Sequence, residues 1–477
     1  TLIPLSTRRR SPADRGGLGS PLKRGLFLFH QTPIPPPLIP VFLLQTPSTS
    51  VFQERAHAMN NDKFEKVAGN GLISRRHLLG MGLGGMSLAA TGSVLGAGAG
   101  LQIPGWSKTP GPGPSAYGAP SAHTQLQRVA GAPNPLYLGG GVSRTPLQHM
   151  QGIITPNSLH FERHHAGIPD IDPAGHQLVI NGLVRQPLVF SYENLLKYPM
   201  VSKVYFIECS GNGNSNTVGG AGGSAQSIHG LVSCSEWTGV PLSTLLDEAG
   251  VLPEARWVAA VGADAASMGR SVPIEKAVDD VLVALFQNGE PVRPEQGYPM
   301  RLFVPGWEGN ISVKWLTQLK LLNGPAQFRD ETSKYTDPLP DRSARQFTFP
   351  METKSLITSP SGEMTLPRAG IYKITGLAWS GSGSIRGVEV SADGGRTWAD
   401  ALLESEQWDK ALTRFSIPWE WNGGNAILQS RAIDSAGNVQ LTREAVIADR
   451  GTDAFYHNPG IQSWAVSSQG DVSSVAV

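Results

Sequence analysis

A cysteine at the end of an apolar run is the first residue of this sequence that could do chemistry. Cys209 follows the run Val204–Ile207 and precedes a turn that begins at Gly211. A thiolate there would project from a rigid strand into a loop-lined cavity, where it could act as a soft metal ligand or a nucleophile. Two alternatives stay open on pattern alone: a buried structural cysteine, and a disulfide with Cys234, the second of the two cysteines.

Two further clusters carry cations that could bind an anion. Arg163 precedes His164 and His165, and neighbours on an extended chain point to opposite sides. We therefore expect Arg163 and one of the histidines to face an anion. Arg301 and Lys314 flank a predicted strand and could clamp a phosphate, because guanidinium binds phosphate in bidentate fashion and ammonium binds it as a point charge. Solvated surface cations are the plainer alternative for these two.

The segments that must position these residues mix short strands and helices over residues 150–345. Ser191 can cap a short helix at Tyr192–Lys197, and a second helix is expected at Pro241–Ala249. Five apolar runs have strand length: His176–Gly182, Val204–Ile207, Trp257–Val261, Val281–Phe286 and Arg301–Val304. The pattern favours one domain of the α+β class.

A second domain, residues 346–465, reads as short strands separated by turns. Asp393-Gly394 and Asn422-Gly423 are turn dipeptides. They separate strand-length segments at Ile371–Ala378, Ile385–Ser391, Arg414–Trp419 and Ala426–Ile433. This spacing is typical of an immunoglobulin-like β-sandwich, and residues 466–477 are set apart as a tail.

The first 150 residues divide into three predicted segments. Residues 1–58 are Pro-rich at TPIPPPLIP and are expected to be a non-native or disordered extension. Residues 59–99 place Ser74-Arg75-Arg76 before an apolar, Gly-rich stretch that ends in small residues, which resembles a twin-arginine export signal. A membrane anchor is the weaker alternative, because the glycines lower its hydrophobicity. Residues 100–149 are expected to be an extended arm.

Composition narrows the class of protein. Gly 56 and Pro 37 make up roughly 20% of the 477 residues and charged residues only 16%, which excludes a coiled coil or long-helix bundle. Residues 1–99 hold 11 Lys/Arg and four Asp/Glu, so residues 100–477 carry a net charge of −6 out of the total of +1. The globular part therefore lacks a basic footprint for nucleic acid. Its two cysteines form no C-x-x-C-H haem attachment motif, so any haem must belong to a partner.

Five motifs in order resemble the sulfite oxidase family of molybdopterin oxidoreductases, over roughly residues 150–465. The residues that carry the resemblance are Phe161-x-Arg163-x-His165, Cys209-Ser-Gly-Asn, Val261-Gly-Ala-Asp264, Pro299-x-Arg301 leading to Ser312-Val-Lys314-Trp, and Ala378-Trp-Ser-Gly with the strand and turn after it. The resemblance implies a mixed α/β molybdopterin domain followed by an immunoglobulin-like dimerisation domain. It also implies a molybdenum–molybdopterin cofactor and homodimerisation through the C-terminal domain.

The family pattern assigns a role to each matching residue. Cys209 would be the metal ligand, Arg163 would neutralise the substrate anion, and Tyr335 would hydrogen-bond the reacting oxygen. These three are the expected catalytic residues. The expected cofactor-binding residues are Phe161, Arg163, His165, Cys209, Asp264, Gln296, Arg301, Ser312 and Lys314. Electrons would pass to a c-type cytochrome subunit.

Three departures from the family pattern bear on the substrate. Asn214 stands where sulfite-oxidising members carry arginine, Gln296 stands where histidine is expected, and Gly219–Gly223 adds an uncharged loop. Fewer cations weaken binding of a small free dianion, and a Gly-rich rim admits a larger substrate. With the export signal, they resemble the periplasmic sulfane dehydrogenase branch, which oxidises sulfur on a carrier protein. Two alternatives remain. One is a dehydrogenase whose substrate is free sulfite, a small sulfur oxyanion. The other is a non-catalytic secreted immunoglobulin-like binding protein.

Overall fold

A computed structural model describes residues 66–74, 103–124, 126–132, 135, 138–214, 223–404 and 406–477. The predicted extension 1–58, the arginines Arg75 and Arg76, and residues 219–222 of the predicted loop lie outside the described residues. Within the described ranges, no helix combines the length and apolar character needed to cross a membrane.

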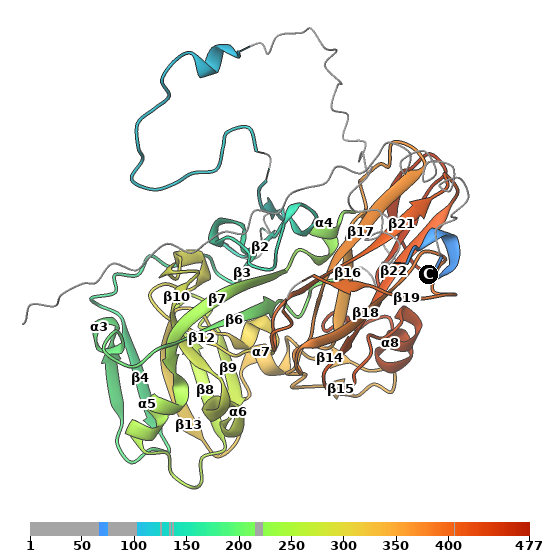
Figure 1. Cartoon of the computed structure of the whole chain (residues 1–477). Coiled ribbons are helices and arrows are strands. Elements are labelled where there is room, and N and C mark those ends of the chain that lie inside the picture. Colours follow the sequence, from blue (N-terminus) through green and yellow to red (C-terminus); the bar gives the residue numbers. More distant parts are fainter. Residues whose placement is uncertain are drawn as a thin grey trace, which may run out of the picture. The chain divides into compact units, whose positions relative to one another are not determined.

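The strand that leads to Cys209 belongs to a five-stranded sheet (Figure 1). Phe206 of β6 pairs with Cys234 of β7, so Cys234 lies inside the sheet and is fully buried. The strands are β6 (Val201–Glu208), β7 (Val232–Pro241), β10 (Leu282–Gln287), β11 (Glu290–Pro291) and β12 (Arg301–Phe303). Both cysteines are free thiols, which removes the disulfide alternative.

A second five-stranded sheet supports the other side of residues 150–345, the predicted catalytic domain. Its central strand β13 (Leu316–Leu322) pairs in parallel with β4 and antiparallel with β8. The remaining strands are β4 (Gln177–Gly182), β5 (Leu188–Ser191), β8 (Trp257–Gly262) and β9 (Gly269–Pro273). Leu, Val and Ile side chains of these strands form one core with those of helix α5 (Leu242–Ala249). The predicted strands are confirmed.

The short helices follow local signals. Ser191 Oγ accepts the backbone N–H of Asn194 at 3.1 Å, and the Asn194 side chain accepts the N–H of Ser191 at 3.1 Å. This capping box starts the helix predicted there, which ends earlier than expected, at Leu195. The helices are α3 (Tyr192–Leu195), α4 (Ala225–His229), α5 (Leu242–Ala249), α6 (Ile274–Asp279) and α7 (Arg329–Thr332).

The predicted arm supplies two strands to a small three-stranded sheet. β1 (Val129–Ala130) pairs with β2 (Gly141–Arg144), which pairs with β3 (Glu162–His164). Strands β14 (Asp337–Pro338) and β15 (Ala344–Arg345) form an antiparallel hairpin at the C-terminal end of the catalytic domain's sequence. Strand β3 carries Arg163 and so brings the arm against the site.

The C-terminal domain is a sandwich of two sheets, as predicted (Figure 1). One sheet has the order β16 (Lys354–Ser359), β17 (Gly370–Trp379), β21 (Thr413–Trp421) and β20 (Leu402–Leu403). The other has the order β19 (Ala399–Asp400), β18 (Ile385–Ser391), β22 (Ala426–Asp434), β23 (Ser463–Val466) and β24 (Val472–Val475). Trp379, Trp419 and Trp464 are buried in its core. Residues 466–477, expected as a tail, include β24 and complete the second sheet.

A helix and a loop interrupt this second sheet between β22 and β23. Helix α8 (Arg443–Arg450) is capped by Thr442, whose hydroxyl accepts the N–H of Ala445 at 3.2 Å. The loop after α8 contacts the catalytic domain through His457, whose N–H donates to Ser210 O at 2.7 Å. The C-terminal domain therefore reaches the loop that follows Cys209.

Candidate active site

One pocket, of about 640 Å³ including the part open to solvent, collects the predicted site residues. Every catalytic and cofactor-binding residue expected from sequence lines it, although their roles stay predictions. The lining is Phe161, Arg163, His164, His165, Ile207, Cys209, Asp264, Met268, Gln296, Arg301, Gly309, Asn310, Ser312, Val313, Lys314, Trp315 and Tyr335. Asn214 is not among these residues.

Cys209 lies at the point where β6 ends and the chain turns. Its N–H donates to Leu231 O at 2.9 Å, and its carbonyl accepts the N–H of Asn212 at 2.9 Å. The backbone is thus held on both sides of the half-buried thiol. Burial raises the pKa of the Cys209 thiol, and the nearby Arg163 acts in the opposite direction. A bound cation would favour the thiolate further.

Arg163 and both neighbouring histidines line the pocket, whereas we expected one histidine to face away. The Arg163 guanidinium donates to the carbonyl of His164. The reason for the difference is that β3 ends at His164 and the chain then turns, with Gly167 at a φ of +85°. His165 Nε2 consequently lies 2.7 Å from the hydroxyl of Tyr335.

Tyr335 and His165 form a neutral hydrogen-bonded pair. Tyr335 is only 5% exposed, and burial raises the pKa of its hydroxyl. Burial, with the positive charge of Arg163, lowers the pKa of His165 to about 3. At neutral pH the imidazole is therefore uncharged and can accept the Tyr335 proton at Nε2. The pair can hold or relay a proton beside Cys209.

Arg301 is a buried cation and Lys314 is half-buried, and neither forms an ion pair with a carboxylate among the described residues. Arg301 donates to the carbonyls of Gln296 at 3.0 Å and Ser312 at 2.8 Å, and its Nε has no partner. Lys314 Nζ donates to the carbonyls of Arg163 and Glu295 and to His164 Nδ1 at 2.8 Å. Burial lowers the pKa of Arg301 to about 9 and lowers that of Lys314 far below its ordinary range. An anion bound between these two groups would raise both pKa values and favour their charged forms.

This donor set fits a molybdenum–molybdopterin cofactor. The Arg301 and Lys314 cations suit its phosphate, and Cys209 supplies a soft sulfur ligand. Within the described part of the chain, no group of three or more His, Cys, Asp or Glu side chains is placed to hold a metal. A metal bound at Cys209 would therefore need donors from a cofactor.

Three predicted cofactor residues also hold the pocket walls together. Gln296 Nε2 donates to Phe161 O at 2.8 Å, which joins two lining segments. Asp264 accepts the N–H of Met268 at 3.0 Å, and Ser312 Oγ accepts the N–H of Val304 at 3.0 Å. These contacts shape the loops whether or not the side chains also touch a cofactor.

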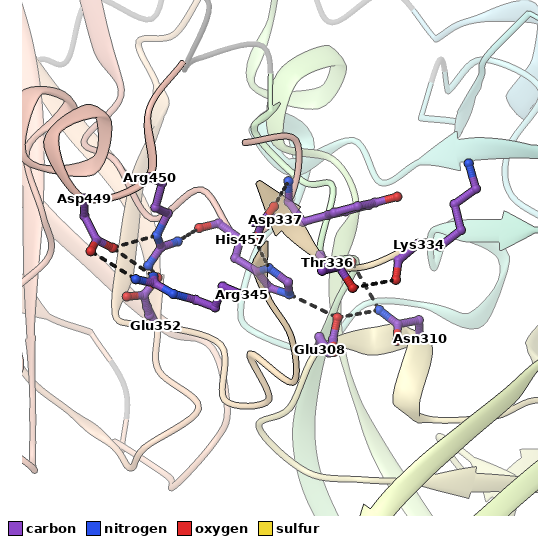
Figure 2. A network of polar contacts seen from close by, with 12 residues as sticks. Glu308, Asn310, Lys334, Thr336, Asp337, Arg345, Glu352, Asp449, Arg450 and His457 are labelled. Carbon is purple, nitrogen blue, oxygen red and sulfur yellow. Dashed lines mark hydrogen bonds and ion pairs between the residues drawn. The ribbon is translucent and has the colours of Figure 1, made fainter. Parts of the chain in front are cut away.

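A buried network that the sequence did not predict joins His457, Asp337, Glu308 and Asn310 (Figure 2). It reaches the loop after Cys209 through Ser210. His457 bonds Asp337 through Nδ1 at 2.8 Å and Glu308 through Nε2 at 3.0 Å. Asn310 donates to Glu308 at 2.7 Å and to Ser210 Oγ at 3.2 Å. Burial lowers the pKa of His457, but the bonds to Asp337 and Glu308 outweigh it and raise the pKa to about 9.

No local pattern marks His457, because its partners lie 120 and 149 residues away in the chain. Asn310, which lines the pocket, lies two residues before the motif Ser312-Val-Lys314-Trp, and that proximity is the only signal that could have indicated it.

Two family models match the chain. Residues 165–328 match the oxidoreductase molybdopterin binding domain, and residues 345–463 match the Mo-co oxidoreductase dimerisation domain. The two matches coincide with the catalytic domain and the sandwich.

Curated relatives and a solved structure agree with these matches. Sulfite oxidase of Gallus gallus is 31% identical over 315 residues, covering 60% of this chain and 68% of that protein. Mitochondrial sulfite oxidase of Mus musculus is 30% identical, covering 61% and 58%, and a nitrate reductase [NADH] of Ulva prolifera is 32% identical, covering 52% and 32%. The chain thus spans about a third to three fifths of the length of these last two. The crystal structure of the sulfane dehydrogenase SoxCD from Paracoccus pantotrophus matches with a TM-score of 0.76 and 44% identity, covering 79% of this chain and 98% of that one.

Proposed function

The chain belongs to the sulfite oxidase family of molybdopterin oxidoreductases, and on that premise we propose that it is a sulfane dehydrogenase that oxidises sulfur held on a carrier protein. The molybdopterin binding domain implies the molybdenum–molybdopterin cofactor, which supplies two-electron oxygen-atom transfer when bound. Membership of this enzyme family removes the alternative of a non-catalytic binding protein.

The chain's own residues divide the work at the pocket. Arg163 binds and orients the anionic sulfur group, and Cys209 holds the metal. The neutral pair of Tyr335 and His165 holds or moves a proton at the Tyr335 oxygen. Each oxygen added to sulfur comes from water, with two protons and two electrons released. We propose that a c-type cytochrome accepts the electrons singly, since the two cysteines of this chain form no haem attachment motif.

The observation that carries the sulfane proposal is an exposed aromatic ring close to the loop after Cys209, outside the residues that line the pocket. A Cβ placed on Gly211 would lie 3.5 Å from Cε1 of Phe455 and 4.0 Å from Sγ of Cys209. The Phe455 side chain is nevertheless 55% exposed. An apolar ring at this position can pack against the peptide arm that delivers a bound sulfur. A free oxyanion gains nothing from it.

Phe455→Ser tests the choice of substrate. We expect kcat/KM for carrier-bound sulfur to fall about tenfold, the loss of one packed aromatic contact, with kcat/KM for sulfite unchanged. Trp408→Ser is the matched control. Trp408 is also an exposed aromatic residue, at 43%, and neither ring lines the pocket, but only Phe455 comes within 4 Å of the Cβ position on Gly211. Equal losses on both substrates would favour the second candidate, a dehydrogenase of free sulfite, which the two sulfite oxidase relatives support.

Localisation and assembly complete the proposal. The Ser74-Arg75-Arg76 sequence supports export to the periplasm by the twin-arginine route, with the cofactor inserted before export. The match of residues 345–463 to a dimerisation domain supports self-association. Molybdenum analysis of protein matured in a molybdopterin-competent host should give about one metal per chain, and its absence would contradict the cofactor assignment.

A further inference from the structure

The segment directly before the arginine pair is docked on the folded C-terminal domain. Leu72 and Ile73 are 0% and 1% exposed, and Leu72 belongs to the core of the sandwich. Residues Lys66–Ile73 form a tight hairpin, because Lys66 bridges Ile73 and the N–H of Val67 donates to Leu72 O at 2.9 Å. Figure 1 shows this short blue segment beside the red strands. A leader that merely precedes the protein needs no such contact.

The hairpin covers a free edge of β21. Strand β17 pairs with β21 along its whole length, but β20 pairs only with Phe415 and Ser416 on the opposite edge. Beyond Ser416 the hairpin pairs with this edge. Leu72 forms a β-bridge with Trp419, and the N–H of Ile73 donates to Pro418 O at 3.2 Å. A proline tolerates this edge because its nitrogen has no hydrogen to leave unpaired. This arrangement is β-strand addition.

Side-chain contacts make the docking specific. The indole Nε1 of buried Trp419 donates to Asn70 O at 2.8 Å, and Asn70 Nδ2 donates to Ala392 O at 2.8 Å. Gly69 N donates to Thr397 Oγ1 at 2.7 Å. Lys66 Nζ lies 3.8 Å from a carboxylate oxygen of Glu420. Contacts thus come from β21 and from the turn after β18.

The tip of the hairpin requires glycine at position 71 and leaves little room at position 69. Gly71 has a φ of +96°, and a Cβ there would lie 2.0 Å from Glu420 O. A Cβ on Gly69 would lie 2.2 Å from Asp393 Oδ2. Asn70 between them has a φ of 55°, a left-handed conformation that asparagine tolerates better than most residues. The sequence Gly-Asn-Gly-Leu-Ile is therefore fitted to this surface.

We propose that the edge of β21 is a peptide-binding site for the chain's own leader, which ties the arginine pair to a folded C-terminal domain. Arg75 follows Ile73 by two residues, so at most about 7 Å of chain separates them. The site requires Pro418, Trp419 and the Asp393 turn to be in place, so the hairpin Lys66–Ile73 can dock only on a folded sandwich. The role of Arg75 and Arg76 as an export signal rests on the proposed function, whereas the docking site does not depend on it.

Hydrogen exchange on the full chain tests the docking. We expect the amides of Val67, Gly69 and Ile73, which donate the hydrogen bonds above, to exchange about a hundredfold more slowly than in a free peptide of the same sequence. Leu72→Asp should abolish that protection. Val67→Asp should keep it, because the Val67 side chain is 43% exposed. Equal exchange in the wild type and Leu72→Asp would overturn the proposal.

A binding experiment covers the possibility that one variant perturbs folding. A labelled Lys66–Ser74 peptide should bind the full-length Leu72→Asp chain, whose edge is vacated, and should not bind the wild type. The same peptide with Asp at position 72 should bind at least about tenfold more weakly. If Leu72→Asp fails to fold, Asn70→Ala, which loses the bond to Ala392, should show severalfold faster exchange at Ile73. No peptide binding to a folded, vacated chain, or unchanged exchange in Asn70→Ala, would overturn the proposal.

Export is read separately, so that the two proposals can fail independently. Arg75→Lys with Arg76→Lys should strand the protein in the cytoplasm while leaving the exchange protection intact. Normal export of that variant would contradict the twin-arginine route and leave the docking site standing.

Discussion

Cys209 is held by backbone bonds on both sides, so its replacement can be read as a change in ligand chemistry. Cys209→Ser should leave a folded protein and reduce turnover more than about a hundredfold. Replacing a residue that only supports a metal ligand typically costs about 10- to 100-fold, so a larger loss indicates the ligand itself. Steady-state assays with carrier-bound sulfur and with sulfite measure the loss. Near-wild-type turnover would refute the ligand role.

Cys234→Ser is the matched control for this prediction. Cys234 is fully buried, and its sulfur lies in hydrogen-bond contact with the backbone of Leu412. A serine hydroxyl can keep that contact, but burying it costs about 1–3 kcal/mol of the free energy of unfolding. Turnover per folded chain should stay unchanged.

A substitution at Arg301 tests whether Arg301 and Lys314 bind an anionic cofactor. Arg301→Gln should lower the molybdenum content of the purified protein at least about tenfold, the loss of one charge-assisted contact to a phosphate. Arg345→Gln is the control, because Arg345 pairs with Asp449 at 2.9 Å outside the pocket. Equal molybdenum content in both variants would show that Arg301 serves the pocket walls alone.

At the scale of elements, the loop after α8 completes a site whose other members come from the catalytic domain. His457 lies between Asp337 of β14 and Glu308, and its backbone N–H donates to the carbonyl of Ser210 beside Cys209. Because its pKa is raised from 6.5 to about 9, its charge stabilises the folded state fully below pH 6.5. That contribution is lost as pH rises through 9.

The expected pH effect can be measured directly. In His457→Gln, the fall in the free energy of unfolding between pH 6.5 and 9 should shrink by on the order of 3 kcal/mol. Denaturant titrations at several pH values measure it, with the exposed His149 as the site of a control substitution to Gln. An unchanged pH profile would mean that His457 is not charged in the network.

The elements that the sequence predicted are those whose signals are local. The strand Ile385–Ser391 and the cap at Ser191 depend on residues within a few positions, and both occur as expected. The set of pocket residues was predicted from the resemblance to the sulfite oxidase family, and two of them, Cys209 and Arg301, stand at the ends of such strands. His457 could not be predicted, since only the fold brings it to Glu308. The docked segment at Leu72 depends likewise on a strand more than 300 residues later.

At the scale of the whole molecule, one buried ion pair joins the two domains behind the site. Glu208, the residue before Cys209, is fully buried and accepts hydrogen bonds from Lys354 Nζ and Trp379 Nε1, both at 2.7 Å. Lys354 and Trp379 belong to the sandwich, whereas Glu208 ends β6 of the catalytic domain. Loosening the sandwich should therefore disturb the Cys209 loop.

Lys354→Met tests this coupling, because it keeps the side-chain length and leaves the Glu208 carboxylate buried without its cation. We expect a loss of about 3–5 kcal/mol in the free energy of unfolding, the usual cost of breaking a buried pair from one side. Lys373→Met is the control: Lys373 pairs with Glu404, but its side chain is 62% exposed, so the loss should stay below about 1 kcal/mol. If the domains are coupled through Glu208, Lys354→Met should also lower the molybdenum content, and Lys373→Met should not. Loss of stability with full molybdenum content would confine the pair to holding the domains together.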